Sequence, residues 1–199
     1  MDGNASMESL LSGAGVAIAA AMLMIVAFAL FRSTGHANEA IALQSIASEV
    51  CGDIGTAAVS SVTVSHNRIY PSEGIKIKIT SDYVIASDET GGEFARPLTV
   101  RVYPGSYSSG GQIFWDDTAG MHEYINRTFG SPGTEASPLN QTAGFEVSVL
   151  IENACRDMAS HPLVISRPEP LTIEKQFLYT YNNTSHVTES EPYVFVFQR

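Results

Sequence analysis

The chain has few cysteines and few basic residues for its length. Its 199 residues include 2 cysteines, Cys51 and Cys155, which is too few for a cysteine-ligated metal cluster, and neither lies in a CxxC pair. The 11 Lys and Arg are outnumbered by 21 Asp and Glu, and the formal net charge is −10. Because the basic residues also form no run, we expect neither nucleic acid nor an anionic lipid surface as a partner.

Patterns that carry catalysis are missing as well. The chain has no GxSxG elbow, no glycine-rich phosphate loop before a helix and no DxDxDG loop. Asp116, Asp117, His122 and Glu123 gather acidic and imidazole groups around Trp115, a combination that suits a small cation or a carbohydrate. A polar loop around one buried aromatic residue explains them more simply. We therefore predict no enzyme, no cofactor and no metal site.

What the chain does have is a long apolar run near its N-terminus. Ser9 to Phe31 spans 23 residues without a charge, between Glu8 and Arg32. As a helix it would be about 34 Å long, slightly more than a hydrocarbon core of about 30 Å. We expect it to cross a membrane once. Small residues in its first half, such as Gly13 and Ala17, favour close packing against another helix, although a simple anchor fits equally well.

Two features of the sequence favour opposite orientations of this helix in the membrane. Arg32 would hold the C-terminal side in the cytoplasm by the positive-inside rule. Against this, the chain has five Asn-x-Ser/Thr triplets, more than its composition predicts by chance, which favours an exported and glycosylated domain. We expect an extracellular C-terminal domain. The candidate glycosylation residues are Asn126, Asn140, Asn182 and Asn183, and the fifth triplet begins at Asn4.

The helical pattern continues beyond the apolar run. Apolar residues recur at steps of three and four from Ala40 to Ala57, which predicts one amphipathic helix reaching to about residue 58. After Ser60 the period changes to two, which is typical of half-buried strands. We expect either a short capped helix or a loop insertion from Asp117, and a surface loop over 131–144. Strands are predicted near 62–64, 75–79, 98–102, 113–115, 145–151, 163–166, 171–181 and 193–197.

These elements predict an α+β chain. A long N-terminal transmembrane helix over 4–59, with its membrane span at 9–31, is followed by an antiparallel, immunoglobulin-like β-sandwich over 60–199. Cys51 lies in the helix and Cys155 beside the apolar pattern of the sheet, so a disulfide between them would clamp helix to sheet. Free thiols are the alternative.

The N-terminal residues resemble a known family. Gly3, then Asn4 to Met7, then Glu8 and a long apolar helix are similar to the N-terminus of type IV pilins and their archaeal relatives, including archaellin-like and minor pilin-like proteins. In that family a prepilin peptidase cuts after a glycine, and a glutamate stands at the fifth mature position. The resemblance implies a leader over 1–3, processing between Gly3 and Asn4, and assembly through Glu8. As an alternative, Glu8 simply marks the membrane boundary.

The resemblance implies a structural subunit or minor component of a type IV pilin-like cell-surface filament. Its partners would be copies of itself or related pilin-like subunits, the membrane and a prepilin peptidase. In such proteins the second half of the helix lies on the β-domain, although the same apolar stripe would also cover the sheet of a monomer. The alternative function is a single-pass, membrane-anchored extracellular binding or adhesion module, or an accessory protein of a surface motor complex.

Overall fold

The computed structural model describes residues 23–24, 38–70, 74–166 and 169–198. Contacts divide the chain into two units, Met1–Ala42 and Leu43–Arg199. Gly3, Asn4, Glu8 and most of the predicted membrane span lie outside the described residues. Leu23 and Met24, which belong to that span, are helical and exposed. Within the described ranges, no helix is both long and apolar enough to cross a membrane.

A helix covers residues 38–59, as the apolar stripe predicts. Its part in the second unit buries one face, formed by Leu43, Ile46, Ala47, Val50, Ile54 and Ala57. These residues belong to the same hydrophobic core as the strands that follow. The compact unit therefore begins within this helix, at Leu43, whereas the sequence placed the domain boundary at residue 60.

The fold of the second unit is α+β, with mostly antiparallel strands. One sheet has the order β1-β10-β11-β5, with the short β8 (Leu139–Asn140) pairing β10 in parallel. Its other strands are β1 (Val64–Arg68), β10 (Leu171–Asn182), β11 (Val187–Gln198) and β5 (Tyr103–Pro104). A second sheet has the order β4-β3-β2-β9, with β4 (Glu93–Pro97), β3 (Tyr83–Asp88), β2 (Ile75–Ile79) and β9 (Leu163–Ile165). The hairpin β6 (Tyr107–Ser109) and β7 (Gln112–Trp115) forms a separate pair.

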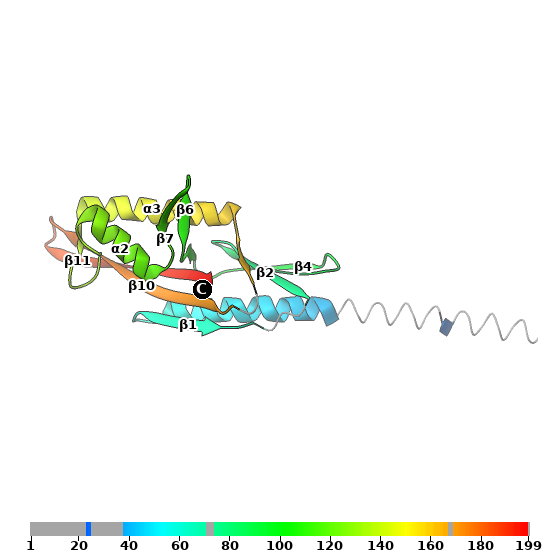
Figure 1. Ribbon diagram of the computed structural model, residues 1–199. Coiled ribbons are helices and arrows are strands. Elements are labelled where there is room, and N and C mark those ends of the chain that lie inside the picture. The colour runs from blue at the N-terminus through cyan, green and yellow to red at the C-terminus, as the bar shows by residue number, and fades with distance from the viewer. Residues whose placement is uncertain (1–22, 25–37, 71–73, 167–168, 199) are drawn as a thin grey trace, which may run out of the picture. The chain divides into compact units, whose positions relative to one another are not determined.

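Strand β11 separates two hydrophobic cores, because successive side chains of a strand point to opposite faces. Val194 and Val196 belong to the core that contains the helix over 43–59. Tyr193 and Phe195 belong to the core that contains α3 (Gln141–Ser160). Figure 1 shows this arrangement, with the β10–β11 hairpin between the cyan helix and the yellow α3.

Helix α2 (Thr118–Phe129) shows that the capped helix, and not the loop insertion, is the correct alternative for the segment after Asp117. Its N-cap is Asp117, whose Oδ1 accepts a hydrogen bond from the Gly120 N–H at 2.7 Å. Gly130 ends the helix with φ 77°, a left-handed conformation that glycine adopts without strain.

The strand predicted over 145–151 is wrong, because α3 occupies this segment. Of the alternating Phe145, Val147, Val149 and Ile151, only Val147 and Ile151, four residues apart, lie on the buried face of the helix. Phe145 and Val149 are 70% and 43% exposed. The predicted surface loop over 131–144 accordingly ends at Asn140, the N-cap of α3.

The strand predicted over 98–102 is also wrong. The backbone there is irregular, although Val102 is fully buried and Leu98 and Val100 are half-buried. The Leu98 N–H donates to the Asp82 carbonyl at 2.8 Å, and the Val102 N–H donates to the Ser81 carbonyl at 2.9 Å. The apolar alternation therefore reports burial of these side chains rather than a continuous ladder.

Candidate assembly helix and its polar contacts

The buried face of the helix over 43–59 contacts both main sheets. Ile54 and its buried neighbours on the helix share a core with Ile77 and Ile79 of β2 and with Ile173 of β10. All four isoleucines are at most 1% exposed. Full burial of an aliphatic side chain contributes about 1.5–3 kcal/mol, so this face is a major part of the stability of the unit.

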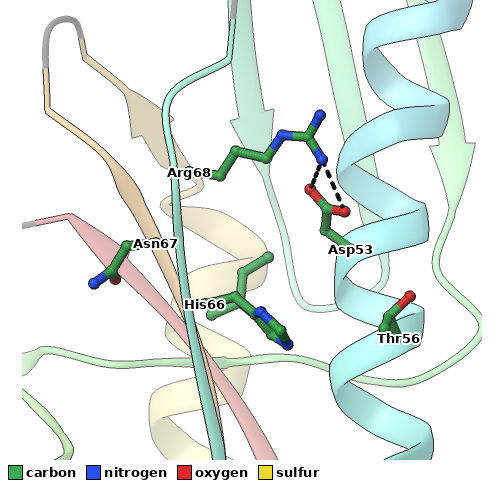
Figure 2. Close-up of a pocket in the computed structure, with 6 residues that line it drawn as sticks. Asp53, Thr56, His66, Asn67 and Arg68 are labelled. Carbon is green, nitrogen blue, oxygen red and sulfur yellow. Dashed lines mark hydrogen bonds and ion pairs between the residues drawn. The ribbon is translucent and has the colours of Figure 1, made fainter.

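Basic side chains from the strands add polar contacts along the helix. Arg68 of β1 donates to the Asp53 Oδ2 at 2.9 Å and also bonds Glu49. Figure 2 shows Arg68 reaching from β1 to Asp53 on the helix. Glu49 and Asp53 stand four residues apart, where like charges repel, and the guanidinium between them relieves that repulsion. The two carboxylates, Asp53 first, raise the pKa of Arg68.

Tyr70 extends this cluster into the core. Its hydroxyl donates to the Asp53 Oδ2 at 2.6 Å, and its ring lies 5.5 Å from the Arg68 guanidinium carbon. Burial, followed by the hydrogen bond to Asp53, raises the pKa of Tyr70. Tyr70 is 2% exposed, so its hydroxyl remains protonated and fixes the Asp53 carboxylate from the buried side.

Lys175 of β10 makes the most buried of these basic contacts. Its Nζ donates to the Ala58 carbonyl at 2.6 Å and to the Ser60 carbonyl, at the C-terminal end of the helix. Carbonyl groups at a helix end lack intrahelical donors and carry partial negative charge, so a cation stabilises them. Lys175 is 6% exposed and also lies over the Phe177 ring at 5.2 Å.

A small cleft lies between the helix and β1. It has a volume of about 140 Å³ and is lined by Asp53, Thr56, His66, Asn67, Arg68 and Ile173. Pockets for organic ligands usually measure about 300–1,000 Å³. Asp53 already bonds Arg68 and Tyr70, and Asn67 accepts from the Thr172 hydroxyl at 2.8 Å. The cleft is therefore a space beside a structural ion pair rather than a prepared ligand site.

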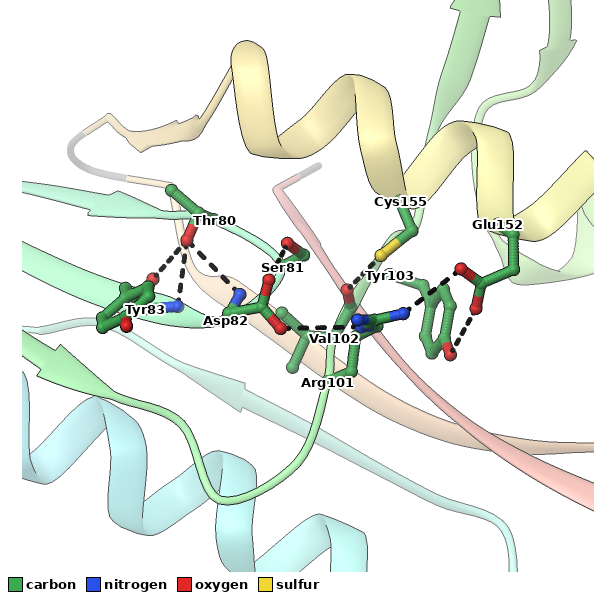
Figure 3. Close-up of polar contacts among 9 residues, drawn as sticks. All are labelled: Thr80, Ser81, Asp82, Tyr83, Arg101, Val102, Tyr103, Glu152 and Cys155. Atoms are coloured by element: carbon green, nitrogen blue, oxygen red, sulfur yellow. Dashed lines mark hydrogen bonds and ion pairs between the residues drawn. The ribbon is translucent and has the colours of Figure 1, made fainter.

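A second polar cluster joins α3 to two loops. Arg101 contacts the Asp82 carboxylate at 3.5 Å and the Glu152 carboxylate at 3.2 Å, and the Tyr103 hydroxyl donates to Glu152 at 3.4 Å (Figure 3). Burial is the main cause that raises the pKa of Tyr103 to about 12. Because the Arg101 side chain is 50% exposed, we assign this cluster a modest structural role.

Both cysteines are free, so the predicted disulfide between Cys51 and Cys155 is not formed in the structure. The Cys155 thiol lies in the second polar cluster and donates to the Val102 carbonyl at 3.7 Å (Figure 3). Cys51 lies on the helix and packs against its core. Burial raises the pKa of both thiols, so neither is an activated nucleophile.

The acidic and imidazole residues near Trp115 serve local structure. Trp115 is 3% exposed and its Nε1 donates to the Pro104 carbonyl at 3.3 Å. Asp117 caps α2, and the His122 Nδ1 lies 2.8 Å from the Pro132 carbonyl. Among the residues that the structure describes, no group of His, Cys, Asp and Glu side chains is arranged to hold a metal.

A groove lies beside the C-terminal half of α3. This groove has a volume of about 410 Å³. Its lining includes Met158, Leu163 and Val196 with the polar side chains of Ser106, Asp157 and His161. The sequence patterns did not predict it, because its lining comes from β5, β6, α3, β9 and β11 and no single motif contains it.

The four candidate glycosylation residues among the described residues lie at the surface. Asn126 is in α2, Asn140 caps α3, Asn182 ends β10, and Asn183 follows in the turn. Three of them are exposed and Asn182 is half-buried.

Comparison with known proteins gives no relative to set beside this site. No family model matches the chain, and no curated protein and no solved structure matches it either. Function must therefore be inferred from the residues of the chain itself.

Proposed function

We propose that the chain is a structural subunit or minor component of a type IV pilin-like cell-surface filament. The observation that carries this proposal is the attachment of the domain to the helix over 43–59, by a buried apolar face and by Arg68 and Lys175. A domain joined in this way to the end of a long helix would follow that helix when it packs among neighbours.

The N-terminal sequence supplies the other half of the proposal. A membrane span over 9–31 would hold the subunit before assembly, and cleavage after Gly3 would free an ammonium at Asn4. Glu8 would then bond the ammonium of a neighbouring subunit, because an unpaired carboxylate is costly in an apolar core. Leu23 and Met24 are helical, with 70% and 68% of their surface exposed, and these side chains need cover from lipid or from neighbouring helices.

The proposal also includes an extracellular position for the domain and an antiparallel, immunoglobulin-like β-sandwich as its fold. The two main sheets share a core, as in a β-sandwich, and this supports the sandwich part of the description. The immunoglobulin-like strand arrangement stays a prediction. No enzymatic activity and no nucleic-acid partner form part of the proposal.

The alternative is a membrane-anchored extracellular binding module. The groove of about 410 Å³ beside α3 favours it, because this volume lies within the range of about 300–1,000 Å³ of small-molecule sites. In this alternative the N-terminal helix remains in the bilayer and the groove binds a ligand at the cell surface.

Substitution of Glu8 separates the two functions. Glu8→Gln removes the charge but keeps the size of the side chain, so it should leave membrane insertion and the outer domain unchanged while reducing incorporation into filaments. Gly3→Leu should block processing and thereby assembly. The measurement is the ratio of this chain in sheared surface filaments to that in membranes, by quantitative mass spectrometry. An unchanged ratio for both variants would favour the anchored module.

A further inference from the structure

The described Asn-x-Ser/Thr triplets differ in how the structure uses each asparagine amide. The Asn140 Oδ1 accepts from the Ala143 N–H at 2.9 Å, as the N-cap of α3. The Asn182 Oδ1 accepts from the Thr184 N–H at 2.9 Å, and its Nδ2 donates to the Glu189 carboxylate at 3.0 Å. These bonds fix the orientation of both side-chain amides, so neither Nδ2 can turn freely toward a transferase. At Asn182 the Nδ2 itself is also engaged by Glu189.

Asn126 is exposed but lies inside α2. The triplet is recognised through both the asparagine and the hydroxyl two residues later. In a helix, residues two apart do not face each other, so the side chains of Asn126 and Thr128 point in different directions. In this helical conformation a single active site cannot bind the Asn126 amide and the Thr128 hydroxyl together.

Asn183 is the one of the four that is exposed, outside a helix and not held by a hydrogen bond of its side-chain amide in the described residues. It is exposed and lies in the turn over 183–186, between β10 and β11. Its partner hydroxyl, on Ser185, is exposed as well. His186 closes the turn with φ 55°, and Val187, where β11 begins, is 53% exposed. Within the described residues, no hydrogen bond holds the Asn183 side chain.

We propose that Asn183 is the residue of this hairpin that carries an N-linked saccharide. The donor would be a saccharide linked to a lipid through phosphate. The Asn183 Nδ2 forms a bond to the anomeric carbon, the bond from that carbon to the phosphate oxygen breaks, and the phosphate leaves with the electron pair. The proton lost from Nδ2 passes to a base of the transferase. The inference rests on the extracellular position in the proposed function.

The overlap of two triplets provides matched variants for the test. Thr184→Ala removes the hydroxyl that the Asn182 triplet needs and leaves the Asn183 triplet intact, because the hydroxyl of the latter is on Ser185. Ser185→Ala does the reverse, removing the Asn183 triplet and leaving that of Asn182 intact. Both changes fall in an exposed turn. Trypsin cleaves after Lys175 and releases peptide 176–199, which contains this hairpin but neither Asn126 nor Asn140.

The full chain is purified from native membranes or filaments, and the mass of peptide 176–199 is measured for each variant. We expect a saccharide mass on the peptide from the unaltered chain and from Thr184→Ala, and its loss in Ser185→Ala. A peptide without added mass in the unaltered chain would overturn the proposal, and so would loss in Thr184→Ala with retention in Ser185→Ala. The mature N-terminus, read from the same digest, tests the filament function separately.

Discussion

The Nζ of Lys175 lies 2.6 Å from the carbonyl oxygen of Ala58, so a strand late in the chain holds the end of the helix over 43–59. Lys175→Met should lower the free energy of unfolding of the second unit by about 1–3 kcal/mol, because two carbonyl groups lose their donor at a buried position. Urea unfolding of a fragment beginning at Leu43 measures the change. Lys76→Met, at an exposed position of β2, is the control. Equal or greater stability of Lys175→Met would contradict the assigned role.

The helix over 43–59 should be required for folding of the β-domain. Removing it would expose Ile77, Ile173 and Val196, each at most 1% exposed in the structure. We expect a fragment over 43–199 to melt cooperatively by circular dichroism, and a fragment over 60–199 to lack a cooperative transition. A synthetic peptide over 38–59 should restore it. Cooperative melting of 60–199 alone, at the same temperature, would show that the domain begins at residue 60.

Tyr103 should make the domain less stable as the pH rises into the alkaline range. Burial raises the pKa of its hydroxyl from 10.0 to about 12, so the folded state disfavours the charged form. Its contribution is therefore complete below pH 10 and is lost as the pH rises from about 10 to about 12. Tyr103→Phe keeps the ring and removes this titration. Across that range, the variant should lose less stability than the unaltered chain in urea titrations. If the variant and the unaltered chain lose the same stability between about pH 10 and about pH 12, Tyr103 makes no contribution to the pH dependence.

The two thiols should be chemically free. In the denatured, unreduced protein, a maleimide reagent should label both cysteines. In the folded protein Cys51 should react first, because Cys155 is 3% exposed. Electrospray mass spectrometry counts the added groups. If the cysteines are labelled only after reduction, the two thiols are not free and the disulfide predicted from the sequence is supported.

The sequence predicted those elements in which the spacing of apolar residues matches the spacing of the positions that the fold buries. The apolar stripe predicted from Ala40 to Ala57 is helical and is buried from Leu43 onward, and the strand Ile75–Ile79 was predicted correctly. A capped helix was one of the two alternatives predicted from Asp117. The segment over 145–151 was predicted wrongly as a strand, because Phe145, Val147, Val149 and Ile151 alternate. The residues buried in this part of the helix, Ala143, Val147 and Ile151, instead recur at steps of four.

The contacts that join the helix to the sheets had no signal in the sequence. Lys175 and Ala58 are far apart along the chain, and Arg68 gives no sign of its partners Glu49 and Asp53. Such pairs depend on the order and register of the strands, which single-sequence periodicity does not contain. The groove beside α3 was missed for the same reason.

The mature N-terminus tests the filament account most directly. The chain is extracted from native membranes and from surface filaments, and its intact mass and N-terminal peptide are measured. The account predicts that the protein in filaments begins at Asn4, after loss of Met1 to Gly3. Native protein that retains Met1 or Asp2 would contradict it, and a membrane-anchored extracellular module would then be the better explanation.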